Sequence, residues 1–335
     1  MKTLFTVLVI AGLGAGCSNA HNLKGENPNS VCTWQSPMTL TQQDLDKKEF
    51  PKYNDTVNLS HEYLVCGDKS KPPVILLHEI LGLEEKTIQY ATTLAQDFAV
   101  YVPLLMGNKD DNGVSFPEGL LTYAFAGEWR QQQDLGDSML VTQWLRKFVK
   151  KVAADHSPKE IAVIGNCLTG ALPLALLDNL LVTKIVLAQP TLPMKTLLGL
   201  GDKEDLVISA KERQTAKHRL NPASPDLPSA KAYGTRFELD KLSAIEKYEY
   251  LGRELGAGFM RRQIAKGEYA YTNRSNTPIQ IEHSPHSSLI HDWHDDPNHP
   301  SQKRRLEIRT FLLNPLDLSQ GCGLGLSAKP EEHGD

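Results

Sequence analysis

The chain has 335 residues, of which 40% are hydrophobic and 23% are charged, and its formal net charge is -4 at pH 7. A chain of this length and composition is expected to form one large globular domain or two smaller ones. Because the chain is slightly acidic and has no long basic run, it lacks the positive surface that nucleic-acid binding requires. We therefore expect no nucleic-acid partner.

The N-terminus has the pattern of an export signal. Lys2 precedes an apolar stretch at residues 4–13, and small residues and Cys17 follow it. This stretch is too short to span a bilayer and is typical of a secretory signal. The segment GLGAGCSN resembles a bacterial lipoprotein cleavage site, at which Cys17 would be lipidated, and cleavage after Ala20 is the alternative. We expect residues 1–17 to be a signal segment and the mature chain to be exported, either periplasmic or held at a membrane by a lipid anchor.

Three of the remaining cysteines are candidates for a disulfide bond. An export compartment permits disulfides, although spacing alone does not reveal their connectivity. Our expected pair is Cys32 with Cys66, which leaves Cys322 over. Cys167 lies inside a motif and is the poorest candidate for pairing.

From residue 60 onward, predicted strands alternate with predicted helices. Apolar runs predict strands at 62–66, 72–80, 99–105, 161–165, 183–190, 232–240 and 278–283. Periodic patterns predict helices at 85–98, 134–156, 168–181, 202–220 and 301–313, and a further helix that starts at the capping-box pair Ser243 and Glu246. This alternation predicts a mostly parallel sheet with helices on both faces. We expect one α/β domain at 60–314, a polar tether at 18–59 and a loose tail at 315–335.

The segment IAVIGNCLTG, at residues 161–170, has the strand–turn–helix pattern of a nucleophile elbow. Gly165 and Gly170 supply the small residues that such a tight turn needs. Cys167 stands at the nucleophile position, and the N–H of Leu168 can stabilise an oxyanion. The N-terminus of the following helix favours a thiolate over a thiol. A structural cysteine buried in a strand–helix turn is the alternative.

Two further segments carry side chains suited to catalysis. LLHEILG places His78 and Glu79 at the end of a buried strand, on the same sheet edge as the elbow, and it lacks the second histidine of a zinc-protease helix. A polar strand end that faces solvent is the alternative there. Residues 281–300 contain five histidines whose spacing fits no compact metal motif, so we prefer one catalytic histidine in a loop over a metal cluster. These histidines are His283, His286, His291, His294 and His299.

Six segments, taken together and in this order, resemble the dienelactone hydrolase family of α/β-hydrolases. They are VILLHEILGL, YVPLLMG, VIGNCLTG, LAQPTLP, YGTRFELDK and PHSSLI, and they cover roughly residues 60–314. The resemblance implies an α/β-hydrolase fold with a mostly parallel central sheet and helices on both faces. We expect neither a cofactor nor a metal.

The resemblance also implies a catalytic triad. Cys167 corresponds to the nucleophile, Asp240 to the acid and His286 to the base, and this order along the chain is the one that the fold demands. His283, three residues earlier, is the alternative base. The triad would hydrolyse a small ester or lactone through an acyl-enzyme.

Three more positions follow from the same resemblance. Glu79 corresponds to a family glutamate that contacts the resting cysteine and turns away when substrate arrives. The backbone N–H groups of Ile80 and Leu168 would form the oxyanion hole. Glu79 thus offers a reason for a cysteine, because a serine hydroxyl is too weak an acid to be controlled in this way.

The chain also departs from the family. The founding enzymes grip a substrate carboxylate with arginines, one of them four residues after the catalytic histidine, where this chain has Ile290. Arg130 and Arg236 are candidate substitutes, and we expect a substrate that lacks the carboxylate of a dienelactone. Two other functions remain open: a catalytically silent surface lipoprotein that acts as a binding module, and a thiol-exchange protein. The complete set of site residues argues against the first, and the lack of a C-x-x-C motif argues against the second.

Overall fold

The computed structural model describes residues 31–45, 47–50, 53, 56–191, 193, 196, 200–221, 228–266, 268, 285–293 and 296–314. All of the described residues belong to one compact unit. Four expected features lie outside the described residues: the signal segment with Cys17, the strand at 278–283, Cys322 and the tail at 315–335.

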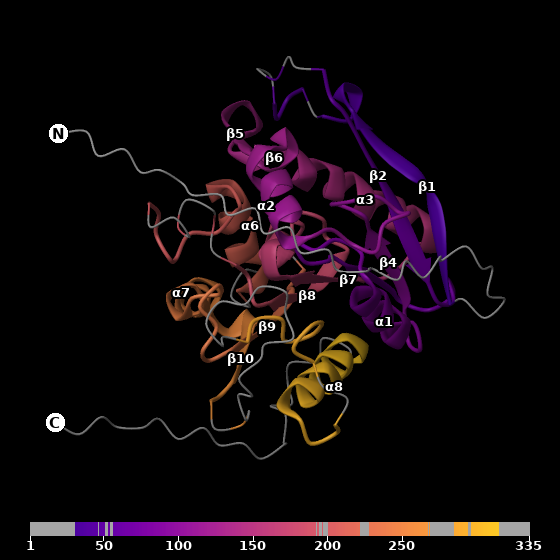
Figure 1. Ribbon diagram of the computed structural model, residues 1–335. Coiled ribbons are helices and arrows are strands. Elements are labelled where there is room, and N and C mark those ends of the chain that lie inside the picture. The colour runs from indigo at the N-terminus through magenta and orange to yellow at the C-terminus, as the bar shows by residue number, and fades with distance from the viewer. Residues whose placement is uncertain are drawn as a thin grey trace, which may run out of the picture. The chain divides into compact units, whose positions relative to one another are not determined.

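The described residues build an eight-stranded central sheet (Figure 1). Its strands, in spatial order, are β1 (Cys32–Thr41), β2 (Asn58–Cys66), β4 (Ala99–Pro103), β3 (Pro73–Leu76), β7 (Ile161–Asn166), β8 (Val182–Ala188), β9 (Lys231–Phe237) and β10 (Phe259–Ile264). The six strands from β4 to β10 are parallel, and β2 is antiparallel to both of its neighbours. This order, with a single reversed strand in second place, is that of the α/β-hydrolase fold, so the predicted fold class is confirmed. A short ladder of β5 (Gln131–Gln132) and β6 (Ser138–Met139) lies outside the sheet.

Helices cover both faces of the sheet (Figure 1). α1 (Glu85–Leu94) and α8 (Pro300–Leu313) pack on one face, and α3 (Leu140–His156), α4 (Leu172–Ala175), α6 (Ala210–Leu220) and α7 (Ile245–Leu255) pack on the other. Side chains of a strand point alternately to the two faces. In β4, Tyr101 therefore enters one core while Val100 and Val102 enter the other. Burial on both faces explains the continuous apolar runs of the parallel strands.

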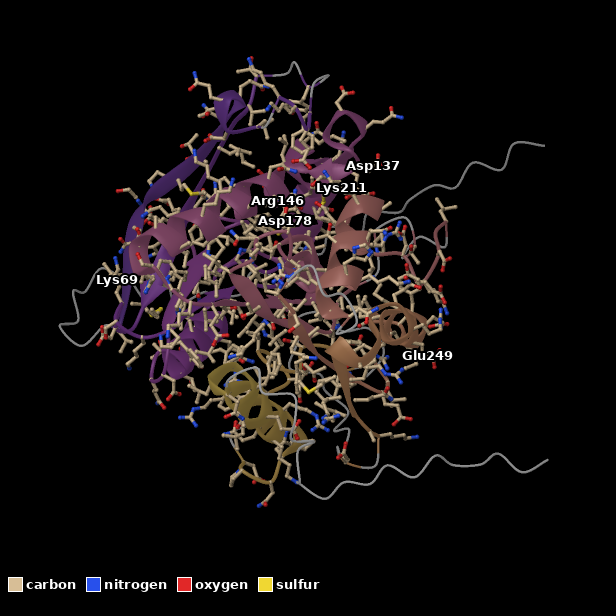
Figure 2. All side chains as sticks on the ribbon, turned by 180° about the vertical axis from the view of Figure 1, so that it is seen from behind. Lys69, Asp137, Arg146, Asp178, Lys211 and Glu249 are labelled. Atoms are coloured by element: carbon tan, nitrogen blue, oxygen red, sulfur yellow. A yellow bond between two sulfur atoms is a disulfide. The ribbon has the colours of Figure 1, made fainter. Side chains whose placement is uncertain are left out.

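Within the described residues, the other helical elements whose bounds are given are short connections. They are α2 (Phe116–Phe125), between β4 and α3, and the 3-10 turns η1 (Gln42–Asp44), η2 (Gly127–Trp129), η3 (Gln133–Leu135), η4 (Cys167–Thr169) and η5 (Gly256–Gly258). Arg146 of α3 lies beside Asp178 (Figure 2), with which it forms an ion pair at 2.5 Å. It also forms an ion pair with Glu212 of α6 at 2.9 Å. These ion pairs connect α3 to α6 and to the turn after α4.

The sheet begins earlier in the chain than expected. Residues 32–41, which we expected in the tether, form β1 and pair with β2 along most of its length. Cys32 lies directly opposite Cys66 in this pairing, and the two form the expected disulfide bond. The polar, irregular sequence of β1 fits an edge strand, and the register shifts between Gln35 and Met38, beside Pro37.

The helix after the elbow is much shorter than the predicted helix at 168–181. The chain forms the 3-10 turn η4 and then the four-residue α4, with Pro173 in the first turn of α4. Proline has no backbone N–H and its ring crowds the preceding turn, so it favours a new start over a continuous helix.

Other helices start later than predicted. The helices expected at 134 and 202 begin at Leu140 and Ala210. The capping box predicted at Ser243 is absent from α7, which begins at Ile245 after the N-cap Ala244.

Candidate active site

Cys167 occupies the tip of the turn between β7 and η4. Its φ angle is +54°, in the left-handed region that residues other than glycine rarely adopt. Only 2% of its surface is exposed, and its thiol is free. Strained backbone of this kind concentrates at functional sites. The position and conformation of Cys167 therefore match the expected nucleophile elbow.

The two glycines of the elbow leave room for this turn. A Cβ atom at Gly165 would lie 2.4 Å from the carbonyl oxygen of Thr169 and 2.7 Å from Cδ of Pro173. A Cβ atom at Gly170 would lie 2.7 Å from Cα of Pro190. Both positions therefore require glycine because of close approach, and neither has a positive φ.

Asp240 and His286 come together beside the elbow, although 46 residues separate them along the chain. His286 Nδ1 hydrogen-bonds Asp240 Oδ2 at 2.8 Å, and both side chains are buried. The other carboxylate oxygen, Oδ1, accepts the backbone N–H groups of Leu242 and Ser243, each at 2.9 Å. Ser243 thus helps to fix the acid instead of capping α7.

The imidazole of His286 has the electrostatics of a paired base. Burial alone would lower its pKa, but Asp240 and a negative charge on Cys167 raise that pKa well above 6.5. Asp240 takes Nδ1, so Nε2 is the atom left to act on the thiol. Nε2 is buried and makes no hydrogen bond within the described residues, and Cys167 is close enough to act on the pKa of this ring. The structure thus brings Cys167, His286 and Asp240 into one group, whereas His283 lies outside the described residues.

The loop that carries Ile80 is tied to the elbow through backbone carbonyls. Asn166 Nδ2 donates to the carbonyl of Leu77, and Thr169 Oγ1 donates to the carbonyl of His78, each at 2.9 Å. Leu168 is the second residue of η4, so its N–H has no acceptor within the turn. The two N–H groups expected to form an oxyanion hole therefore belong to loops that are bonded to each other.

His78 has a structural role in this loop. Its Nε2 accepts the backbone N–H of Leu105 at 2.9 Å, so Nδ1 carries the proton and donates to the carbonyl of Glu79 at 2.6 Å. Burial lowers the pKa of His78 to about 4. A neutral, buried His78 therefore holds the Glu79 backbone, and the alternative of a strand end that faces solvent is wrong here.

Glu79 is buried, but it is turned toward other partners than expected. Its Oε1 accepts the Ser287 hydroxyl at 2.5 Å and the Gln189 side-chain amide at 3.1 Å, and its Oε2 lies 3.7 Å from Nε2 of His291. Within the described residues it makes no hydrogen bond to Cys167. The expected contact with the resting cysteine is thus not seen in this structure. Burial raises the pKa of Glu79, and His291 and His286 oppose that rise.

The histidines of residues 281–300 have separate tasks where they are described. His286 pairs with Asp240 at 2.8 Å, His291 pairs with Glu84 at 2.7 Å, and His299 caps α8 by accepting the N–H of Ser301. His283 and His294 lie outside the described residues. In the part of the chain that is described, no group of three or more His, Cys, Asp or Glu side chains is placed to hold a metal ion.

The two arginines considered as substitutes for the carboxylate-binding arginines of the family make contacts with backbone carbonyls. Arg236 is buried and donates to the backbone carbonyls of Ser243, Glu238 and Asp240, so it shapes the loop of the acid. Arg130 reaches two backbone carbonyls at the end of α2, each at 3.5 Å. Ile290, at the place of the family arginine, is buried.

Lys247, which belongs to no sequence motif, is linked to the elbow through the backbone of Thr191. Lys247 of α7 is buried and donates through Nζ to the carbonyl of Thr191 at 2.5 Å, and the N–H of Thr191 donates to the carbonyl of Cys167 at 3.1 Å. Burial lowers the pKa of Lys247 to about 7. Lys247, together with Gln189 and Ser287, thus shapes the site although sequence reasoning missed all three.

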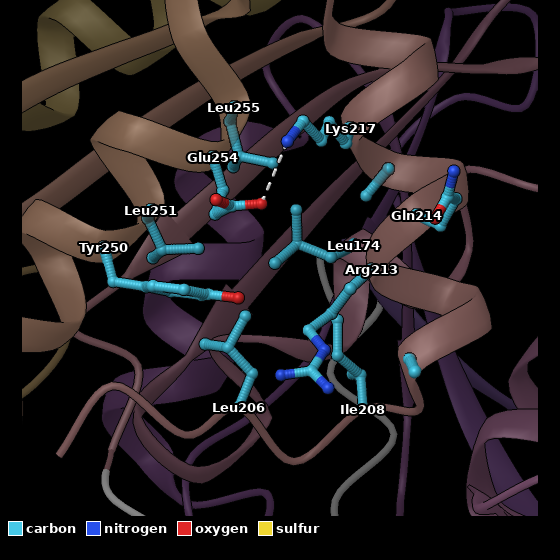
Figure 3. A pocket seen from close by; sticks show the side chains of 12 residues that line it. Leu174, Leu206, Ile208, Arg213, Gln214, Lys217, Tyr250, Leu251, Glu254 and Leu255 are labelled. Atoms are coloured by element: carbon cyan, nitrogen blue, oxygen red, sulfur yellow. Dashed lines mark hydrogen bonds and ion pairs between the residues drawn. The ribbon is translucent and has the colours of Figure 1, made fainter. Parts of the chain in front are cut away.

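A separate hollow lies between α6 and α7 (Figure 3) and has a volume of about 220 Å³. Its floor is apolar, with Leu174, Leu206 and Ile208, and Lys217 and Glu254 form an ion pair at its edge. Its lining includes none of Cys167, Asp240 and His286, so it is distinct from the site around Cys167. No helix in the described part of the chain has the length and apolar character needed to cross a bilayer.

Comparison with solved structures found several likenesses, of which three follow. The chain is similar to a Klebsiella pneumoniae protein described as a dienelactone hydrolase, at 14% identity, with 83% of this chain and 99% of that one covered and a TM-score of 0.49. It is similar to a dienelactone hydrolase-like promiscuous phosphotriesterase from metagenomic libraries at 15% identity, with 84% of this chain and 99% of that one covered and a TM-score of 0.48. It is also similar to a Bacillus subtilis carboxylesterase at 12% identity, with 82% of this chain and 96% of that one covered and a TM-score of 0.40. No protein-family model matches the chain, and no curated protein matches it. The assignment of the fold rests on the strand order of this chain itself.

Proposed function

We propose that the protein is a hydrolase of small esters or lactones that uses Cys167 as its nucleophile. The observation that carries the proposal is the buried group of Cys167, His286 and Asp240 at the nucleophile elbow of an α/β-hydrolase fold. A nucleophile, a base in contact with it and a third group that orients the base form the usual arrangement for acyl transfer.

The proposed reaction has two halves. Cys167 gives its thiol proton to His286, and its sulfur attacks the ester carbonyl carbon. The N–H groups of Ile80 and Leu168 stabilise the negative oxygen that forms. When this intermediate collapses, the C–O bond breaks and the protonated His286 gives its proton to the departing alkoxide. Water then attacks the thioester while His286 takes a proton from it, and the acid is released as the thiolate leaves. Asp240 keeps the imidazole oriented and stabilises its charged form throughout.

We propose a substrate that lacks a carboxylate near the scissile bond. The proposal is supported by the engagement of Arg236 with three backbone carbonyls and by the apolar Ile290 next to the catalytic loop. An uncharged ester or a simple lactone therefore fits this site better than a dienelactone does.

The test is turnover by the purified mature protein. We expect hydrolysis of p-nitrophenyl acetate or of a simple lactone, with less activity on dienelactone. Replacement of either reacting group, as Cys167→Ala or His286→Ala, is expected to lower kcat/KM by roughly a thousandfold or more. Full activity in both variants would contradict the proposal. Absence of turnover with every ester would instead favour the binding-module alternative.

We also propose that the protein is exported and carries a lipid on Cys17. The support is the N-terminal sequence pattern together with the Cys32–Cys66 disulfide, since such bonds persist in oxidising compartments. Radioactive palmitate fed to an expressing bacterium is expected to label the wild type but not Cys17→Ala. Equal labelling of the two proteins would refute lipidation at this residue.

A further inference from the structure

The Glu79 carboxylate is held in place by donors that lie away from Cys167. Ser287 Oγ donates to Oε1, and the same Ser287 oxygen accepts the backbone N–H of His291 at 2.8 Å, which fixes the direction of the hydroxyl. Gln189 Nε2 donates to the same carboxylate oxygen. Two donors on one oxygen are the arrangement expected for an ionised carboxylate.

The orientation of Gln189 is itself enforced by its neighbours. Its Oε1 accepts both the hydroxyl and the backbone N–H of Ser288, at 2.6 and 3.3 Å, so its amide nitrogen must face Glu79. The backbone of Gln189 has a φ angle of +37°, which is strained for a residue with a side chain. The loop after β8 is thus bent in a way that presents a donor to Glu79.

His291 is the cation that faces the remaining oxygen of Glu79. Its Nε2 lies 2.7 Å from Glu84 Oε1 and 3.7 Å from Glu79 Oε2, and 3% of the residue is exposed. Burial alone would lower the pKa of this imidazole, but Glu84 and Glu79 raise it, and Lys86 opposes them. His291 thus lies within ion-pair distance of two carboxylates, and in its protonated form it makes a second ionic group beside Cys167 and His286.

We propose that His291 is a positioning residue that holds the Glu79 carboxylate away from Cys167, so that the cysteine pairs with His286 alone. This inference rests on the proposed function, because it concerns the state of the same nucleophile. It differs from a gate that opens when substrate arrives, since Glu79 is already turned aside in this structure.

The charges around Glu79 explain why His291 is needed. The groups that act on it are His291, His286 and Glu84, and the only other cation among them is His286 of the triad. Without the charge of His291, Glu79 would compete with Cys167 for the proton and the positive charge of His286. The thiolate would then form only at higher pH.

The reactivity of Cys167 toward iodoacetamide, measured against pH, tests this idea without any substrate. His291→Asn is expected to move the acid limb of the rate profile up by about one pH unit, which lowers the rate below that limb about tenfold. Thiolate absorbance in the ultraviolet should show the same shift. The exposed His218 on α6 offers a matched control, and His218→Asn should leave the profile in place.

A double-mutant cycle separates charge from structure. In a Glu79→Gln background, the additional change His291→Asn should leave the acid limb unmoved, since no carboxylate remains to be redirected. A uniform loss of rate at every pH, or an equal shift with and without Glu79, would overturn the proposal.

If His291→Asn does not fold, Glu79→Gln alone still decides the matter. The ring carbons of ¹³C-labelled His291 should then titrate at lower pH than in the wild type, because a charge that raises the pKa of His291 has been removed. An unchanged titration would overturn the proposal. Normal alkylation behaviour without any ester turnover would defeat the proposed function and leave this inference standing.

Discussion

At the scale of single residues, the elbow depends on close packing around the strained backbone of Cys167. Cys167 takes a positive φ so that its side chain leaves β7 and faces His286. The turn can close this tightly only because Gly165 has no Cβ, and the ring of Pro173 occupies the volume beside it. The ring of Pro173 therefore packs directly against Gly165, and the position of Gly165 has no room for a side chain.

This packing predicts that Gly165→Ala is strongly destabilising. The new Cβ would lie 2.4 Å from a carbonyl oxygen and 2.7 Å from a ring carbon, neither of which is the free end of a flexible side chain. We expect the free energy of unfolding in urea to fall by roughly 2 kcal/mol or more. Gly127→Ala is the matched control, because a Cβ added there would meet no atom within 4 Å, and we expect a change within about 0.5 kcal/mol. Equal stability of the two variants would show that the elbow relaxes freely.

The residues that could be predicted from sequence are those whose role is tied to a local pattern. Cys167 stands inside a turn motif, and Asp240 and His286 follow from the family resemblance. His291 was only one of five histidines and Gln189 only part of a matching segment, and neither was given a role, since each acts on Glu79 across about one hundred residues or more. Their importance depends on how two loops approach each other, and that approach is visible only in the folded chain.

At the scale of elements, the parallel interior of the sheet was predictable and its edges were not. Strands β3, β4, β7, β8 and β9 are buried on both faces and read as apolar runs. The edge strands β1 and β10 are only partly buried. An edge strand keeps polar and charged side chains where it meets solvent, so its hydrophobic pattern is weak. Because the hydrophobic pattern of residues 32–41 is weak, we predicted a tether where the chain forms β1.

The connections show a second limit of local patterns. An apolar run of helical length follows the elbow, yet the chain forms a 3-10 turn and a four-residue helix there. The run is apolar because residues 168–177 are buried, and burial does not distinguish a helix from tight turns. The positions of the prolines and glycines decide the outcome, and their effect depends on what packs against them.

At the scale of the whole molecule, the reversed strand β2 joins the edge strand β1 to a parallel interior. The Cys32–Cys66 disulfide links these two strands at one end of their pairing, where the residues lie directly opposite. The other edge, β10, has no such link among the described residues. The covalent bond thus secures the sheet edge that is formed from the N-terminal part of the described chain.

This arrangement predicts that the disulfide stabilises the fold without serving the catalytic site. The bond closes a loop between residues 34 apart in sequence, so the double variant Cys32→Ser with Cys66→Ser is expected to lose about 2–4 kcal/mol of unfolding free energy. The wild type reduced with dithiothreitol should show the same loss, which provides an internal control for the effect of serine. Because Cys167 stays a thiol in all three samples, ester turnover per folded molecule should be unchanged. A large loss of turnover at a temperature where the variant is fully folded would mean that β1 also positions the catalytic residues.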